Sequence, residues 1–315
     1  MIEVDEVGPA RAEDVLASIR AGFGARELLE PPSTATAETL ESVRAALRTH
    51  GGLVATAESG PVGAVLFDRS GDLLVMRRLA VRPDDQSRGV ARALVRRAEQ
   101  VADRLGFEGI RIVARAEIPR TVRLWQHLGY TEIGRDRTRL TFAKVLPVEV
   151  EAASADAARL LGSRLARILR AGDLVILSGG LGAGKTTFAQ GVGAGLGVRG
   201  EVTSPTFVIS RVHPSLADGP ALVHVDAYRL GGVTELDDLD LDTTLDDAVT
   251  LVEWGEDVAE GLAADRLEVQ IDRVDRASRD GEDRRTLRLT PVGPRWVGAG
   301  LRTALTSNRP DDGTA

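Results

Sequence analysis

The pattern of hydrophobic and polar positions predicts alternating strands and helices over the first 146 residues. Stretches such as GLVATAES, PVGAVLFDRS and DLLVMRRLAV alternate with a period close to two, which is typical of half-buried strands. Helical spacing separates them and is clearest at Leu94, Ala98 and Val101. The predicted elements are strands at 2–7, 52–59, 61–70, 72–81, 109–114 and 139–146, and helices at 10–23, 37–50, 89–105 and 119–128.

The alternation restarts near Pro147, where we place a domain boundary. A strand at 146–150 and a helix at 155–170 come first. Apolar strands follow at 173–178, 206–212, 221–227, 248–254 and 266–271, with a helix at 185–196 after the first of them. Such strands separated by helices favour a mainly parallel sheet flanked by helices. The predicted fold class is α/β, with a mixed α/β sheet domain at 1–146, a second domain at 147–293 and a disordered tail at 294–315.

Composition is that of a globular chain. Its 315 residues suffice for two domains of about 150 residues each. No apolar run approaches the roughly 18 residues of a membrane span, and the first residues lack a signal-peptide pattern. We therefore expect a cytoplasmic protein with no membrane partner. The absence of cysteine excludes disulfides, thiolate catalysis and Cys-based zinc sites.

Charge is divided unevenly between the two halves. Residues 1–147 carry 22 Arg+Lys and 20 Asp+Glu, whereas residues 148–315 carry 18 and 27, which gives the net charge of −7. Binding to a phosphate backbone needs a basic surface. We therefore expect any contact of the second half with RNA to be indirect, through a partner.

A glycine-rich loop follows the strand at 173–178. Residues 179–186, GGLGAGKT, fit the Walker A pattern GxxxxGK[ST], in which backbone N–H groups and a helix N-terminus hold phosphates. Lys185 is expected to neutralise the β- and γ-phosphates and the Thr186 hydroxyl to ligate Mg²⁺. The expected nucleotide contacts are Gly180, Leu181, Gly182, Ala183, Gly184, Lys185, Thr186 and Thr187.

The phosphate loop alone does not distinguish an ATPase from a GTPase or a small-molecule kinase. A GTPase is expected to carry an NKxD-type base-reading loop, and the only asparagine in this chain is Asn308. A GTPase is therefore disfavoured.

Two carboxylates end apolar strands of the second domain, Asp226 in LVHVDAYRL and Glu253 in VTLVEW. Ligand groups gather at strand ends in open α/β sheets, and Mg²⁺ prefers oxygen ligands. Either carboxylate alone could merely begin a loop, but beside a phosphate loop both become candidate metal ligands or water-positioning groups. The candidate catalytic residues are Lys185, Asp226 and Glu253, and the candidate metal ligands are Thr186, Asp226 and Glu253.

The order of motifs in the second domain resembles one known family. SGGLGAGKTTFAQG, TSPTFVIS, HVDAYRL and LVEWGE are similar to the corresponding segments of TsaE, the ATPase subunit of bacterial tRNA threonylcarbamoyladenosine biosynthesis. The resemblance implies that Lys185, Thr186 and Thr187 hold ATP and Mg²⁺, with Asp226 and Glu253 completing the metal shell. It also implies TsaD-like and TsaB-like partner proteins, so that tRNA is met only indirectly.

The resemblance assigns roles to two further segments. Residues 204–207, SPTF, would form a switch-like loop near the γ-phosphate, with Trp254 beside the site. The chain departs from the family at Ala158, where members tend to carry a threonine that helps to hold the nucleotide. The adenine contacts therefore stay unassigned.

The first domain contains a second candidate anion site. Residues 86–91, QSRGVA, precede a predicted helix, so Gly89 would let a pyrophosphate approach free N–H groups. LWQHLGY follows, and the order resembles the GNAT acyltransferases over about residues 2–145, which implies a GNAT-like sheet and acetyl-CoA. The implied contacts are Leu79, Ala80 and Val81 along the pantetheine arm and Gln86, Arg88, Gly89, Val90 and Ala91 at the pyrophosphate.

The first domain also departs from the acyltransferase pattern. Trp125 stands where a tyrosine would protonate the leaving thiolate, and Ile118 replaces a frequent asparagine. The strand at 72–81 offers no glutamate as a base, and Tyr130 is expected to pack in the core. The amine acceptor stays unknown.

Three functional readings remain open from the sequence. The leading one is a fusion of an acetyl-CoA-dependent N-acetyltransferase with a TsaE-like ATPase. The second is an acyl-CoA-sensing domain that regulates a nucleotide-gated interaction module. The third places a small-molecule kinase in the second half.

Overall fold

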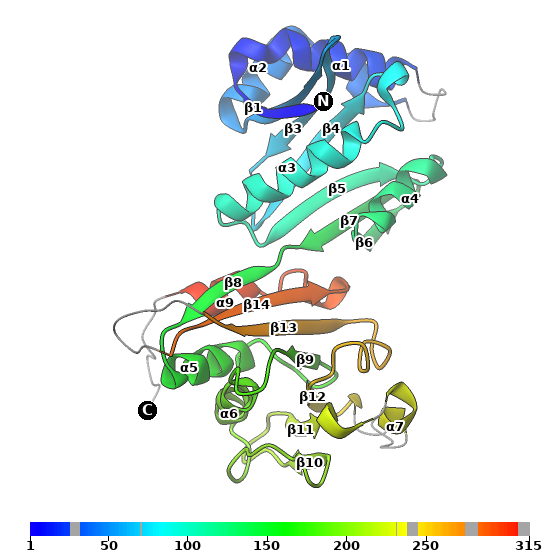
Figure 1. Ribbon diagram of the computed structural model, residues 1–315. Coiled ribbons are helices and arrows are strands. Elements are labelled where there is room, and N and C mark those ends of the chain that lie inside the picture. The colour runs from blue at the N-terminus through cyan, green and yellow to red at the C-terminus, as the bar shows by residue number, and fades with distance from the viewer. Residues whose placement is uncertain (26–31, 70, 231, 238–244, 275–282, 308–315) are drawn as a thin grey trace. The chain divides into compact units, whose positions relative to one another are not determined.

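A computed structural model of the chain describes residues 1–25, 32–69, 71–230, 232–237, 245–274 and 283–307. The chain divides into two compact units, residues 1–146 and 147–315, each with its own seven-stranded sheet (Figure 1). Among the described residues, no helix has both the length and the apolar character needed to cross a bilayer.

The N-terminal unit is a mixed sheet with helices on both faces. Its strands are β1 (Glu3–Val7), β2 (Gly52–Ala57), β3 (Gly60–Asp68), β4 (Leu73–Val81), β5 (Gly109–Arg115), β6 (Thr131–Asp136) and β7 (Arg139–Val145). Its α-helices are α1 (Ala12–Gly24), α2 (Leu40–Thr49), α3 (Val90–Arg104) and α4 (Pro119–His127). The strand order is β1-β2-β3-β4-β5-β7-β6, in which β4 and β5 are the parallel neighbours and the other pairs are antiparallel.

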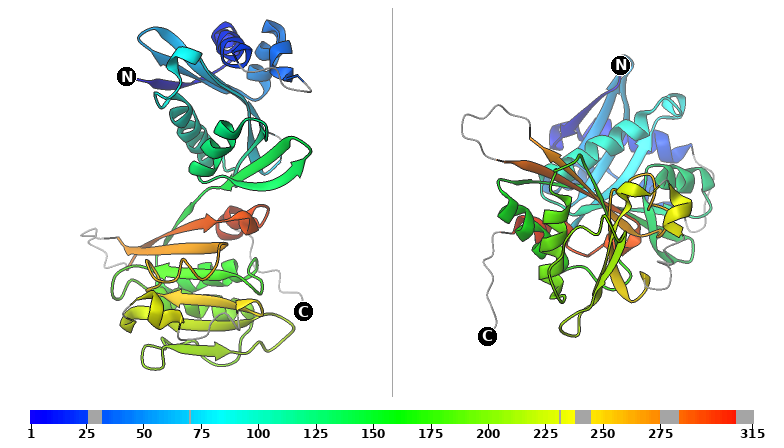
Figure 2. Two further views of the ribbon diagram at one scale, coloured as in Figure 1. Left: turned by 90° about the vertical axis from the view of Figure 1, so that its right-hand side faces the viewer. Right: turned by 60° about the horizontal axis from the view of Figure 1, so that its bottom comes forward.

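The two faces of this sheet carry separate hydrophobic cores. Successive residues of β2 alternate between them: Leu53 belongs to the core under α3 and α4, and Val54 to the core under α1 and α2. Leu94 from α3 and Ile19 from α1 are both fully buried. Figure 2 shows the helices on both sides of the sheet.

The C-terminal unit is built around a sheet with a parallel centre. Its strands are β8 (Val148–Ala152), β9 (Leu174–Ser178), β10 (Ser210–His213), β11 (Ala221–Asp226), β12 (Ala248–Glu253), β13 (Arg266–Arg273) and β14 (Arg285–Val292). Its described α-helices are α5 (Ala155–Ala166), α6 (Lys185–Leu196), α7 (Val233–Asp237) and α9 (Leu301–Thr306). The order is β10-β11-β12-β9-β13-β14-β8; β11, β12, β9 and β13 run parallel, and β10, β14 and β8 join antiparallel.

Part of the predicted disordered tail is ordered. Residues Pro294–Trp296 form a 3₁₀ helix, and α9 follows. Three apolar side chains of this segment are at most 2% exposed, namely Trp296, Leu301 and Leu305. Their burial orders the segment, although its glycine and proline content is typical of a loop. Residues 308–315 of the predicted tail lie outside the described residues.

Close packing of α5 against α6 fixes the helix that follows the phosphate loop. A Cβ on Gly191 would fall on the carbonyl oxygen of Arg159, and a Cβ on Gly162 would fall on that of Phe188. Glycine is therefore required on both helices for the backbones to approach this closely.

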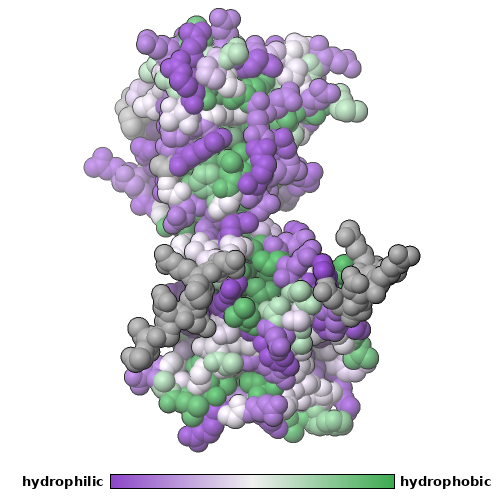
Figure 3. All heavy atoms as spheres, turned by 90° about the vertical axis from the view of Figure 1, so that its left-hand side faces the viewer, coloured by the Kyte–Doolittle hydropathy of each residue, from purple (hydrophilic) through white to green (hydrophobic). Residues whose placement is uncertain are grey.

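Apolar side chains also reach the surface of the C-terminal unit around β10. Phe207, Val208, Val212 and Leu216 are each more than half exposed. Figure 3 shows one face of the molecule, on which hydrophobic groups stand among hydrophilic ones in both units.

Candidate functional sites

The glycine-rich loop joins the end of β9 to the start of α6, which is the context that the Walker A pattern requires. Gly179, Gly182 and Gly184 have φ angles of 137°, 72° and 108°, a region that residues with a Cβ rarely adopt. Gly184 is the N-cap of α6, so the loop ends where the unpaired N–H groups of a helix begin. The segment therefore has the geometry of a phosphate cradle.

Lys185 lies against its own loop and is only 5% exposed. Its Nζ donates hydrogen bonds to the carbonyl oxygens of Gly179, at 2.8 Å, and Gly180, at 3.1 Å. The same Nζ is 3.4 Å from the centre of the Trp254 ring. Loop carbonyls and an aromatic face thus stabilise the Lys185 ammonium.

The remaining loop residues differ in exposure. Leu181 is 83% exposed, whereas Ala183 is 2% exposed and Thr187 is half-buried on α6. Ala158, at the family's threonine position, is buried on α5 and offers no side-chain hydrogen bond.

Asp226 and Glu253 end neighbouring parallel strands, β11 and β12, and stand opposite each other in register. Asp226 and Glu253 are each 3% exposed. Burial lowers the pKa of Lys185, and the negative charges of Glu253 and Asp226 act in the opposite direction. The candidate catalytic lysine and carboxylates therefore share one electrostatic environment.

Each carboxylate oxygen of Glu253 accepts one hydrogen bond. The Thr186 hydroxyl donates to Oε2 at 3.0 Å, and Nε2 of His224 is 2.9 Å from Oε1. Thr186 and Glu253, predicted to act together, are thus brought into direct contact. His224 belongs to no sequence motif that predicts a role for it.

Asp226 holds the segment predicted to be a switch-like loop. Its Oδ2 accepts hydrogen bonds from the hydroxyls of Ser204, at 2.8 Å, and Thr206, at 2.6 Å. Its Oδ1 accepts the backbone N–H of Tyr228 at 3.1 Å. Phe207 points away from the core and is 86% exposed.

The donor set at these strand ends fits a magnesium ion that arrives with phosphates. Thr186, Asp226 and Glu253 supply the hard oxygen ligands that Mg²⁺ prefers. Within the described part of the chain, no group of three or more His, Cys, Asp or Glu is placed to hold a metal ion alone. Mg²⁺ commonly binds through one or two carboxylates together with substrate phosphates, which matches this arrangement.

Arg285 supports the phosphate loop from β14 and was not anticipated. Its Nε donates to the carbonyl oxygen of Ala183 at 2.7 Å, and Nη2 pairs with Asp283 at the same distance. Arg285 is 7% exposed. No sequence signal distinguishes it from the other arginines, because the contact joins positions that are 102 residues apart.

The candidate acyl-CoA site lies where β4 and β5 separate. Residues Leu73–Met76 of β4 pair with residues Gly109–Ile112 of β5. The pairing ends there, although β4 continues to Val81 and β5 to Arg115. A bulge opposite β3 follows, and Arg78 within it has a φ of 58°. The predicted pantetheine contacts at 79–81 begin at Leu79 within the bulge, on a strand segment beyond the pairing of β4 with β5. A free strand edge offers backbone groups that an extended amide-containing arm can bind.

The predicted pyrophosphate site occupies the turn before α3. Ser87 and Gly89 have φ angles of 65° and 85°, and the space around Gly89 is open. Arg120 at the start of α4 secures the turn, with Nη1 3.3 Å from Gln86 Oε1 and Nη2 3.0 Å from Ser87 Oγ. Arg88 is exposed and pairs with Asp85. Arg120 was missed because it is distant in sequence from the motif.

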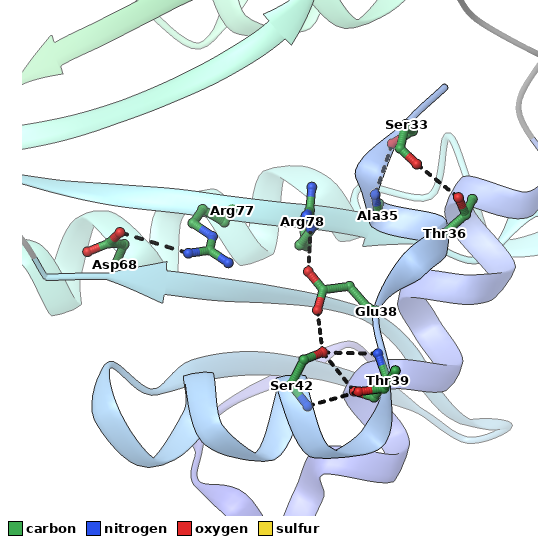
Figure 4. Close-up of polar contacts among 9 residues, drawn as sticks. All are labelled: Ser33, Ala35, Thr36, Glu38, Thr39, Ser42, Asp68, Arg77 and Arg78. Atoms are coloured by element: carbon green, nitrogen blue, oxygen red, sulfur yellow. Dashed lines mark hydrogen bonds and ion pairs between the residues drawn. The ribbon is translucent and has the colours of Figure 1, made fainter. Parts of the chain in front are cut away.

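A carboxylate from the segment before α2 reaches the β4 bulge (Figure 4). Glu38 Oε1 accepts a hydrogen bond from Arg78 Nε at 2.8 Å, and Oε2 accepts one from the Ser42 hydroxyl at 2.6 Å. Burial raises the pKa of Glu38, but the hydrogen bonds from Ser42 and Arg78 and the charges of Arg78 and Arg77 outweigh it and leave the pKa lowered. Glu38 is therefore an anionic anchor of the bulge.

Tyr130 packs in the core, as predicted. It is 1% exposed, and its ring lies 5.1 Å from that of Trp125 in an edge-on contact. Its hydroxyl donates to Glu99 at 3.3 Å, and burial, with a smaller effect of Glu99, raises its pKa well above the ordinary value.

Comparison with known proteins finds a family match in each unit. Residues 152–281 match the family model "Threonylcarbamoyl adenosine biosynthesis protein TsaE", and residues 48–132 match "Acetyltransferase (GNAT) domain". The chain is 63% identical over 142 residues to the tRNA threonylcarbamoyladenosine biosynthesis protein TsaE of Streptomyces coelicolor, covering 45% of this chain and 95% of that protein. It is 40% identical over 133 residues to TsaE of Bacillus subtilis, covering 42% and 77%.

A solved structure is similar to the GNAT half. The PaiA N-acetyltransferase from Thermoplasma acidophilum in complex with coenzyme A is 15% identical, with a TM-score of 0.42, and the match covers 46% of this chain and 99% of that one.

The fold and loop geometry make the C-terminal unit a P-loop nucleotide-binding domain. Through this unit the chain belongs to the TsaE family of tRNA threonylcarbamoyladenosine biosynthesis. Its N-terminal unit contains residues 48–132, which match the family model of a GNAT acetyltransferase domain.

Proposed function

We propose that the chain is bifunctional, with an ATP-hydrolysing TsaE unit and an acetyl-CoA-dependent N-acetyltransferase unit. The contact between Thr186 and the buried Glu253 carboxylate, directly after the phosphate loop, carries the first half of the proposal. Mg²⁺ bound with ATP would supply charge stabilisation for the departing diphosphate. Water attacks the γ-phosphorus, the bond to the β–γ bridging oxygen breaks, and ADP and inorganic phosphate leave.

The chain's own residues divide this work among them. Lys185 binds the phosphates, Thr186 and Asp226 hold the metal, and Glu253 completes the metal shell or orients the attacking water. Proteins similar to TsaD and TsaB are the proposed partners, which fits the acidic C-terminal half. The tRNA would then be met through those partners.

The ATPase proposal is tested by phosphate release from the full chain with TsaD-like and TsaB-like partners from the same cell. Glu253→Ala should keep Mg²⁺–ATP binding but lose turnover by about 10²- to 10⁴-fold. Glu256→Ala, which removes an exposed neighbouring carboxylate, is the matched control and should retain turnover. Phosphate transferred to an acceptor molecule would identify a kinase, and wild-type turnover in Glu253→Ala would remove Glu253 from the mechanism.

The acetyltransferase proposal rests on the separation of β4 from β5 after Met76 and Ile112. The amine nitrogen of the acceptor forms an amide with the acetyl carbon, the carbon–sulfur bond breaks, and the proton released by the amine ends on the coenzyme A thiol. The acceptor is an amine of unknown identity.

Thiol release from acetyl-CoA over a panel of amines tests this half, and a chain without cysteine adds no background to a thiol reagent. Gly89→Val should abolish coenzyme A binding because it strains a φ of 85° and fills the approach to the helix. Gly71→Val is the matched control, since Gly71 has a φ of 82° in the β3–β4 turn. Binding without thiol release from any amine would favour the acyl-CoA-sensing alternative, and a chain that binds no coenzyme A would contradict both.

A further inference from the structure

His224 is a buried histidine on β11, two residues before the candidate ligand Asp226. Side chains on a strand repeat their direction every two residues, so His224 and Asp226 share one face of the sheet. The parallel register places Asp226 opposite Glu253 on β12 and His224 opposite Leu251. His224 is therefore a diagonal neighbour of Glu253 on that face.

The contact between His224 and Glu253 is direct and shielded from water. Nε2 of His224 is 2.9 Å from Oε1 of Glu253, and the two side chains are 0% and 3% exposed. A carboxylate can only accept a hydrogen bond, so Nε2 carries the hydrogen. With the Thr186 hydroxyl bound to Oε2, donors on opposite sides fix the rotation of the carboxylate.

An imidazole at this position is costly for the fold. Nδ1 of His224 has no hydrogen-bond partner in the described structure, and leaving a buried polar atom unpaired is unfavourable. The neighbouring β11 residues Leu222, Val223 and Val225 are apolar and equally buried, so packing alone does not call for histidine. What histidine adds is the Nε2–H group that points at Glu253.

We propose that His224 is a positioning residue for the ATPase reaction, holding the Glu253 carboxylate in its working orientation. The inference rests on the proposed ATP hydrolysis and deepens it. Groups that orient the first ligands of a site commonly change activity without touching the substrate themselves.

Replacing His224 with glutamine or asparagine separates the effect of the hydrogen bond from the effect of burying a polar side chain. Glutamine can place its amide nitrogen near the Nε2 position of histidine, whereas the shorter asparagine reaches only the Nδ1 position. We expect His224→Asn to lower kcat by about 10- to 100-fold while the dissociation constant for Mg²⁺–ATP stays within about threefold. His224→Gln should recover most of the lost turnover. Equal turnover in both variants and in the wild type overturns the inference. Weaker nucleotide binding with an unchanged kcat overturns it as well.

His213 on β10 is the matched control. It is 4% exposed, its ring centre is 6.5 Å from that of His224, and its Nε2 also lacks a partner in the described structure. It makes no hydrogen bond to Glu253 among those that the structure describes. His213→Asn and His213→Gln should therefore keep wild-type kcat, and thermal unfolding of all four variants identifies any that fail to fold.

Nuclear magnetic resonance of ¹⁵N-histidine-labelled full chain tests the contact without any turnover. His224 should show protonated Nε2 and unprotonated Nδ1, and Glu253→Gln should move the His224 Nε2 signal but not the His213 signals. An unmoved His224 signal overturns the contact. A wild-type chain that hydrolyses no ATP with its partners overturns the proposed function, whereas wild-type turnover in His224→Asn overturns this inference alone.

Discussion

Lys185 is one of only two lysines in the chain, and its surroundings explain why its charge matters. The ammonium is buried, and its present partners are two loop carbonyls and an aromatic ring, all weaker than a phosphate. We expect Lys185→Ala to weaken Mg²⁺–ATP binding by at least about 100-fold in isothermal titration calorimetry, equivalent to about 3 kcal/mol.

Lys144 provides the control, because it is the other lysine and forms an ion pair with Glu99 in the N-terminal unit. Lys144→Ala should bind Mg²⁺–ATP with wild-type affinity. If Lys185→Ala also binds normally, the loop does not use this cation for phosphates.

Glu38 gives the N-terminal unit a predictable response to acid. Its pKa is lowered in the folded chain, so its contribution to the free energy of unfolding is complete above the ordinary value of 4.5. That contribution is lost as the pH falls through the lowered folded value. We expect Glu38→Gln to lower the melting temperature at pH 7 and to make it less sensitive to pH below about 4.5.

Thermal unfolding of the full chain between neutral and acid pH measures this difference. Glu58→Gln, which changes an exposed glutamate in the β2–β3 turn, should follow the wild-type curve. A Glu38→Gln curve that parallels the wild type at every pH would show that the contact with Arg78 does not stabilise the fold.

At the scale of elements, the packing of α5 on α6 controls the position of the phosphate loop. Gly191→Ala would push a methyl group into the Arg159 carbonyl, and the helices must then separate. We expect a loss of about 1–3 kcal/mol in the free energy of unfolding, measured by urea titration, despite the better helix propensity of alanine. Gly261→Ala, where a Cβ meets nothing within 4 Å, should change stability by no more than about 0.5 kcal/mol. A stable Gly191→Ala variant would mean that the helix contact is not tight.

The hydrophobic pattern predicts most elements but misses two strands. β6 is an edge strand with no buried residue, so period-two alternation is absent. β14 has only Leu287 and Leu289 alternating with polar residues, which is too short a signal. The prediction of a mainly parallel sheet describes the four central strands, whereas the three outer strands join antiparallel. Local periodicity carries no information about strand direction at an edge.

At the scale of the whole molecule, two ligands should act on two separate stretches of backbone. Hydrogen exchange of the full chain should slow over 179–188 when Mg²⁺–ATP is added and over 79–91 when coenzyme A is added, because bound backbone amides are protected. Lys185→Ala should lose the first protection and keep the second. Protection of the same amides by both ligands would contradict the assignment of one site to each unit.

The amino-acid sequence by itself predicted the two α/β units, a domain boundary near Pro147, the glycine-rich Walker A loop and the carboxylates at two strand ends. These features are local, because each depends on a short run of residues whose spacing determines the local backbone conformation. Only the tertiary structure decided which side chains support them. His224 on β11 reaches Glu253 on the neighbouring strand β12, and Arg285 on β14 reaches Ala183 in the loop after β9, with β13 between the two strands. The sheet brings these distant positions together, and neither segment carries a periodic pattern that predicts the contact.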